Sequence, residues 1–161
     1  MDREAFLPLR DDEVTDQEAV CRLINYVDLF DPIVDELVSN RTANKKLGVG
    51  NDYYNTGRYF VVRDEFQLWL GVALKLWRDN GITPLWCQFK RLDSEAGITK
   101  DQFRANPELI AGAQFDGKGQ LFVPIRLKTG VERDRVVGDA VAQIERVVDT
   151  LLGKSPEVSQ T

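Results

Sequence analysis

Gln88 and Lys90 have the residue types and the spacing that could support a chemical reaction. They lie two positions apart in the segment CQFK, residues 87–90, which is predicted to be a strand. Side chains two positions apart on a strand point to the same side. A lysine there could polarise an attacking water, while carboxylates hold Mg²⁺. Asp64 and Glu65, in a predicted turn upstream, could supply those carboxylates.

This pattern would make the chain a small Mg²⁺-dependent nuclease. A strand that ends in acid-x-Lys is typical of metal-dependent nucleases with a restriction-endonuclease-like core, and glutamine replaces the acid in some of them. Glu36, on the first predicted helix, could assist. Against this, a whole predicted helix separates Asp64 from Gln88, and so short a motif is common by chance. Solvated side chains at strand ends are the alternative explanation, and we favour it.

Histidine is absent from the 161 residues. Its absence rules out Ser-His-Asp and Cys-His catalysis, histidine bases, and the usual zinc and non-haem iron sites. Cys21 and Cys87 are too few to form a metal-binding set, and their apolar neighbours predict two buried free thiols. A disulfide between them stays open, although it would be unusual for an intracellular chain. We therefore expect no resident cofactor, or Mg²⁺ if the nuclease interpretation holds.

The three tryptophans lie within residues 66–89 and suggest two different roles. Trp69 and Trp86 are predicted on the same face of two strands, and Trp77 on a short helix between them. They could form a second core that joins this helix to the sheet, each indole N–H having a hydrogen-bond partner. Alternatively, Trp69 and Trp86 could form an exposed platform for stacking a base or binding a partner. We favour the core interpretation.

One segment, residues 41–58, combines basic and aromatic side chains. Its candidate binding residues are Arg41, Lys45, Lys46, Tyr53, Tyr54 and Arg58. Its GVG sequence lacks the preceding strand and the continuation of a phosphate-binding loop. The net charge of −5 argues against a general electrostatic affinity for nucleic acid, without excluding a local basic patch. We expect contact with an anion or a partner here, or else a plain surface loop.

Apolar periodicity and capping signals predict one α+β domain over residues 15–153, between a polar arm (1–14) and a polar tail (154–161). TDQE at 15–18 fits a capping box, and residues 16–43 predict a kinked helix or two helices end to end, with Asp31-Pro32 as a second start. Residues 44–59 predict a loop, and 58–62 with 66–74 a hairpin. A short helix ending at Gly81, a strand over 83–90 and a helix or loop over 99–112 follow.

A strand pair with a turn at 116–119 comes next, and Pro124 predicts that its second strand is an edge. A long amphipathic helix from Val131 ends the domain at Gly153. We thus expect an antiparallel sheet of about four or five strands, packed by long N- and C-terminal helices with a short helix inserted between strands. No apolar run is long enough for a membrane span, and no signal peptide begins the chain, so we expect a cytoplasmic protein.

The runs GRYFVV, FQLWLGVALKLWRDNGITPLW and LFVPIRLKTGVERDRVVGDAVAQIERV resemble the C-terminal region of certain uncharacterised bacterial proteins. Some of those longer proteins carry a restriction-endonuclease-like, PD-(D/E)XK nuclease segment upstream. The resemblance covers about residues 20–152, and its motifs are structural, so they transfer no catalytic residues. The upstream segment has no counterpart here, which leaves nuclease activity in doubt. The resemblance implies an accessory or recognition module associated with nucleic-acid processing or with defence against foreign DNA.

Two hypotheses follow from the sequence. The first is a non-catalytic binding module whose partner is a protein or a nucleic acid, working through residues 44–59 and any exposed part of the tryptophan face. The second is the Mg²⁺-dependent nuclease. A homodimer through the sheet edge or the last helix is compatible with both.

Overall fold

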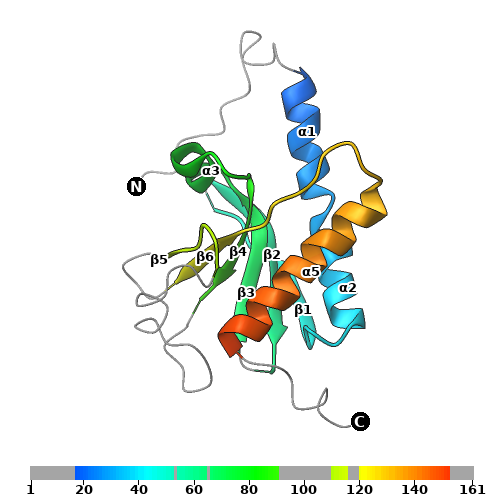
Figure 1. Ribbon diagram of the computed structural model, residues 1–161, viewed down its shortest axis with the longest axis vertical. Helices are drawn as coiled ribbons and strands as arrows, with labels where there is room; N and C mark the ends of the chain where they lie inside the picture. The colour runs from blue at the N-terminus through cyan, green and yellow to red at the C-terminus, as the bar shows by residue number, and fades with distance from the viewer. Residues whose placement is uncertain (1–16, 53, 65, 91–109, 116–119, 153–161) are drawn as a thin grey trace.

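The protein folds into one open, six-stranded antiparallel sheet with helices packed against it (Figure 1). The computed structural model describes residues 17–52, 54–64, 66–90, 110–115 and 120–152, and the statements below concern these residues. The helices are α1 (Gln17–Val27), α2 (Phe30–Ser39), α3 (Leu74–Asn80) and α5 (Arg133–Leu152). The strands are β1 (Lys45–Val49), β2 (Asn55–Val62), β3 (Phe66–Ala73), β4 (Leu85–Phe89), β5 (Gln114–Phe115) and β6 (Leu121–Pro124). The α+β class is confirmed, with more strands than expected.

The first long helical segment is two helices end to end, α1 and α2. The backbone breaks after Val27, and α2 begins at Phe30, so Pro32 falls in the first turn of α2. A proline is tolerated there because the first turn of a helix has no intrahelical partner for its N–H groups. Asp31 in the same turn complements the positive end of the helix dipole. The sequence signal for a second helix start is thereby explained.

The strands follow the order β1-β2-β3-β4-β6-β5, and all neighbours are antiparallel. The predicted hairpin is β2–β3, and its eight-residue ladder runs without a bulge from Asn55↔Ala73 to Val62↔Phe66. The predicted loop at 44–59 is wrong in its extent, because β1 and the first residues of β2 occupy most of it. Only residues 50–54 connect these two strands.

β6 lies inside the sheet, between β4 and β5, although Pro124 predicts an edge. Across the sheet, the Ile125 N–H donates to the Leu85 carbonyl of β4 (2.9 Å). Alternate residues bond to opposite neighbours, so the nitrogen of Pro124 faces the β5 side. β5 pairs only as far as Phe122, which leaves no β5 carbonyl opposite the proline. The missing N–H therefore costs no ladder hydrogen bond.

The two faces of the sheet bury different side chains. The helix face carries the aliphatic row of β3, together with Leu85, Cys87 and Phe89 of β4, and these side chains are buried under the helices. Figure 1 shows α2 and α5 side by side across this face. The opposite face, which we call the tryptophan face, carries a smaller cluster built on Trp69 and Trp86. The alternation predicted for β3 and β4 is confirmed.

The last helix is the long amphipathic element that its pattern predicts. Eight of its residues are buried: Val137, Ala140, Val141, Ile144, Val147, Val148, Leu151 and Leu152. Each of the buried Val, Ile and Leu side chains contributes about 1.5–3 kcal/mol through the apolar area removed from water. The Arg63 guanidinium, in the β2–β3 turn, donates to the Leu152 carbonyl and ties this turn to the end of α5.

Some predictions concern residues outside the described ones. These are the capping box at 15–18, most of the helix or loop at 99–112, the turn at 116–119, the end of the last helix at Gly153, and the two polar ends of the chain.

Candidate binding site

A row of cross-strand neighbours crosses the tryptophan face. Tyr59 on β2 pairs with Trp69 on β3, which pairs with Gln88 on β4, which pairs with Phe122 on β6. Neighbours opposite each other in such a row lie about 5 Å apart at Cβ and share one face. Three aromatic rings and one amide thus come from four strands to the same line.

Trp69 packs against two glycines, Gly57 and Gly71, and supports the β1–β2 connection. A Cβ placed on Gly57 or Gly71 would come within 2.6 or 2.4 Å of its indole ring. The indole N–H donates to the carbonyl of Gly50 (2.8 Å), at the start of that connection. Its side chain is only 3% exposed. This geometry fits the core role predicted for Trp69. Part of Trp69 also lines the pocket described below.

Trp86 is completely buried, so it has no surface to offer a partner. Its indole N–H donates to the Thr83 carbonyl (2.7 Å). The hydroxyl of Thr83 donates to the Ile125 carbonyl (3.0 Å) and accepts from the Leu85 N–H (3.2 Å). The binding role assigned to Trp86 from the sequence is therefore wrong, because the side chain is buried. Its N–H and the Thr83 hydroxyl both bond to nearby backbone groups.

Trp77 departs from the predicted three-tryptophan core, because 43% of it is exposed. Leu76, its neighbour in α3, packs on the Trp69 and Trp86 cluster instead. The Asn80 side chain donates to the Leu76 carbonyl (2.8 Å) and accepts from Gln114. The packing of Leu76 and the bond between Asn80 and Gln114 attach α3 without using the indole of Trp77.

A pocket opens on the tryptophan face beside the β1–β2 connection and holds about 190 Å³. The residues that line it are Gly50, Asn51, Asp52, Asn55, Tyr59, Trp69, Gln88, Gln120 and Phe122. Its lining combines aromatic ring atoms with side-chain amides and one carboxylate. Sequence reasoning missed Gln120 and Phe122, although the alternation in GQLFVP places both on this face.

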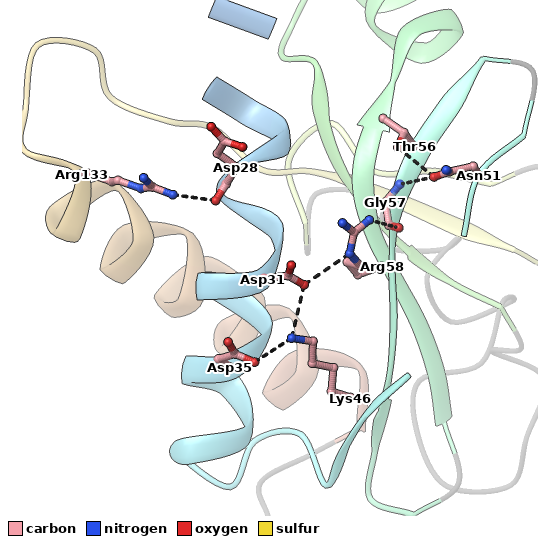
Figure 2. Close-up of polar contacts among 9 residues, drawn as sticks. All are labelled: Asp28, Asp31, Asp35, Lys46, Asn51, Thr56, Gly57, Arg58 and Arg133. Carbon is pink, nitrogen blue, oxygen red and sulfur yellow. Dashed lines mark hydrogen bonds and ion pairs between the residues drawn. The ribbon is translucent and has the colours of Figure 1, made fainter. Parts of the chain in front are cut away.

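The rim of this pocket is fixed by short polar side chains in the connection. Asn51 Oδ1 accepts from the Thr56 hydroxyl (2.8 Å) and the Gly57 N–H (3.3 Å), as Figure 2 shows. Asp52 accepts from the Tyr54 N–H (3.0 Å) and the Asn55 amide (2.9 Å). Asn and Asp often fix turns in this way, by bonding nearby backbone groups. The sequence GNDYYN signals a turn, but not a pocket.

Of the nuclease candidates that the structure describes, Gln88, Lys90 and Asp64, each makes a contact of its own with another part of the protein. Gln88 and Lys90 do point to the tryptophan face, as the spacing predicts. However, Gln88 donates to Gln120 (2.6 Å), and Lys90 Nζ contacts the Tyr59 hydroxyl (3.0 Å) and lies 4.5 Å from its ring centroid. Asp64 is exposed in the β2–β3 turn, where its N–H donates to Asn44. Glu65 lies outside the described residues. Within the described segments, no three Cys, Asp or Glu side chains gather closely enough to hold a metal ion.

Two of the predicted basic residues are neutralised by α2. Lys46 Nζ lies 3.1 Å from Asp35 and 3.3 Å from Asp31, and Arg58 Nε lies 3.3 Å from Asp31 (Figure 2). The hydrogen bond from Lys46 to Asp35, with the help of Asp31, raises the pKa of Lys46 above its usual value. The Arg58 guanidinium also lies 5.8 Å from the Phe30 ring centroid. Both cations serve to join β1 and β2 to α2.

The other predicted binding residues lie apart from one another. Arg41 is exposed in the α2–β1 turn with a left-handed φ of 62°, and Lys45 is exposed on the outer strand β1. Tyr54 is 51% exposed in the β1–β2 connection, while Tyr53 lies outside the described residues. The predicted set is therefore no single basic surface.

The cysteines differ from each other. Cys87 is buried in β4, as expected, and burial raises the pKa of its thiol. Cys21 is exposed on α1, so the prediction that it is buried is wrong. Both are free thiols.

Models of known protein families, curated proteins and solved structures provide no match to this chain. The resemblance to bacterial nuclease-associated proteins thus stays a prediction. Across the described segments, every helix is too short or too polar to cross a bilayer.

Proposed function

We propose that this protein is a non-catalytic binding module whose recognition region is the β1–β2 connection and the pocket that it borders. The pocket carries the proposal, because ordered amides and aromatic rings from β2, β3, β4 and β6 converge where this connection is fixed. Such a mixture of apolar surface and a few placed polar groups is typical of ligand sites.

The size of the pocket indicates what it receives. Its volume of about 190 Å³ is below the roughly 300–1,000 Å³ of sites for drug-sized molecules. One side chain or one base would fill it. A partner that inserts a single group and makes its other contacts around the rim therefore suits the site better than a free cofactor.

A protein partner is favoured over a nucleic acid. Phosphate binding requires clustered cations, but Lys46 and Arg58 already pair with Asp31 and Asp35. The net charge of −5 works in the same direction. Nucleic-acid association remains an outcome that the experiment below can reveal.

Self-association through β1 is not supported by its sequence. Lys45 and Lys46 stand on this edge strand, and the β1–β2 pairing shifts register between Lys46 and Val49. Charged residues and bulges are the means by which natural edges avoid pairing with other strands. The last helix is the other route to the predicted homodimer, and sedimentation of the intact chain tests it.

Crosslinking in cells of the source organism, with the full chain as bait, tests the proposed function. Asn51→Ala removes the acceptor that fixes the connection, and Tyr54→Ala truncates its exposed ring. We expect both variants to capture less of the partner while remaining folded at the assay temperature, which thermal unfolding verifies. Lys45→Ala, an exposed change outside the connection, is the matched control. Equal capture by all four proteins would contradict the proposal.

A cleavage assay addresses the nuclease alternative. Plasmid DNA, single-stranded DNA and RNA are incubated with the protein and Mg²⁺. We expect no cleavage above a buffer control. Cleavage that is lost in Lys90→Ala would instead establish the nuclease and overturn the binding-only proposal.

A further inference from the structure

Three large apolar side chains are exposed together at the α3 end of the sheet. Tyr54 is 51% exposed, Leu74 38% and Trp77 43%. We call these three residues the α3 patch. Trp and Tyr are the residue types most enriched among the energetic centres of protein interfaces.

Backbone pairing makes the α3 patch continuous. The Leu74 N–H donates to the Tyr54 carbonyl (3.1 Å), one step beyond the last β2–β3 pair, Asn55↔Ala73. This bond holds the backbone of Tyr54 next to the first residue of α3. Trp77 follows Leu74 by three positions in α3, so the two are surface neighbours.

The exposure of Trp77 is not a consequence of a loosely attached helix. Leu76 packs on the Trp69 and Trp86 cluster, the Asn80 side chain accepts from Gln114, and Gly81 ends α3 in a left-handed conformation with its N–H bonded to the Trp77 carbonyl (2.7 Å). Leu74 and Trp77 of the α3 patch are thus presented on an attached helix. An ordered apolar surface loses little conformational entropy when a partner covers it.

Basic side chains flank the α3 patch in a chain that is acidic as a whole. At about 100° per residue around α3, Arg78 lies beside Leu74, and Lys75 lies next to Arg78. The Arg78 side chain is 70% exposed and pairs with Asp79 (3.0 Å). Because a surface ion pair of this kind contributes little, Arg78 can exchange Asp79 for a carboxylate of a partner.

We propose that the α3 patch binds an acidic peptide segment of a partner protein, whose apolar or aromatic side chains cover Tyr54, Leu74 and Trp77. The inference rests on the proposed function, and it names the chemistry of the partner. The patch exposes roughly 300 Å², at about 100 Å² for each half-exposed side chain. A stable dimer needs about 800 Å² from each copy. A short segment anchored by two or three side chains fits this area, whereas a second copy of this chain does not.

A random linear peptide library, displayed on phage and selected against the full-length protein, tests the proposal. Selected sequences are then synthesised, and their affinity is measured by fluorescence anisotropy. We expect enriched peptides that combine Asp or Glu with aromatic or aliphatic residues. Trp77→Ala should weaken their binding at least about 30-fold, as expected for an interface hot spot.

Two further variants separate surface chemistry from folding. Arg78→Glu keeps the apolar patch and reverses one flanking charge, so it should weaken binding about tenfold or more at low salt, and less at high salt. Ile24→Ala is the matched control, because Ile24 is an exposed apolar residue on α1, 52% exposed and outside the patch. It should bind peptides as the unmodified protein does. Thermal unfolding verifies that every variant is folded.

Other outcomes overturn the inference in distinguishable ways. Peptides that lose affinity in Asn51→Ala but not in Trp77→Ala would reject the α3 patch and leave the proposed function intact. Enrichment of basic peptides would reject the charge assignment. If no peptide is enriched, the peptide inference is rejected, whereas capture of a partner in cells would still support a binding function.

Discussion

The contact between Trp69 and Gly71 allows a sharp test of the packing on the tryptophan face. In Gly71→Ala, the new Cβ would lie 2.4 Å from Cζ2 of Trp69 and 2.3 Å from the carbonyl oxygen of Thr56. The indole is tied to Gly50 by a hydrogen bond, and β3 is paired on both sides. Relief therefore requires that β2 and β3 separate locally.

The cost follows from that geometry. Overpacking a tight core costs about 1–3 kcal/mol, and a clash that includes backbone belongs at the upper end, about 3 kcal/mol. In a chain of this size, each kcal/mol lowers the melting temperature by about 2–4 °C. We thus expect Gly71→Ala to melt about 6–12 °C below the unmodified protein.

Thermal unfolding followed by far-ultraviolet circular dichroism measures this shift. Gly48→Ala is the control, because no atom lies within 4 Å of its added Cβ and its φ is not left-handed. It should change stability by no more than about 0.5 kcal/mol. If Gly71→Ala melted within about 2 °C of the unmodified protein, the close packing of Trp69 against this glycine would be refuted.

Three further predictions concern buried polar groups, charge and thiols. Thr83→Val should lower the free energy of unfolding by about 1–3 kcal/mol, because two buried backbone groups lose their partner, while Thr83→Ser should retain most of it; urea titration measures both. Lys46→Ala should cost at most about 1 kcal/mol at low salt and nothing at high salt, with Lys45→Ala neutral throughout. Since the pKa of Lys46 is raised in the folded state from 10.5, its contribution is full below pH 10.5 and disappears as pH rises through the folded pKa, which unfolding measured against pH would reveal. Cys21 should react with a thiol reagent in the folded protein, and Cys87 only after unfolding.

Elements whose apolar pattern has one clear period could be predicted from the sequence. The alternation in β3 and β4 identifies which side chains share a face, and the 3.6-residue spacing identifies α5. These patterns exist because each element buries one face against a single core. Local chemistry also sufficed for the end of α3, where Gly81 adopts the left-handed φ of 65° that favours glycine.

Elements that depend on distant partners could not be predicted. β1 has a Gly-containing sequence with an exposed pattern, and it is a strand because it pairs with β2 and packs beside α2. β6 is interior because β5 pairs with it, and Pro124 is tolerated there because this pairing ends at Phe122. In both cases tertiary pairing overrides a local signal. The pocket is missed for the same reason, since Gln120 and Phe122 meet Tyr59 only through two intervening strands.

The basic segment shows why a candidate site can mislead when it is taken from local composition. Asp31 and Asp35 are four positions apart, so they lie on the same side of α2. Lys46 lies 11 residues after Asp35, and Arg58 lies 27 residues after Asp31. The antiparallel pairing of β1 with β2 brings both cations next to that acidic side of α2. There the two aspartates neutralise the positive charges that the sequence alone suggests are available to a ligand. A cationic run that follows a helix with acids at four-residue spacing is therefore better tested first as an internal ion-pair network. The proposed recognition surfaces, the pocket and the α3 patch, lie outside this ion-pair network.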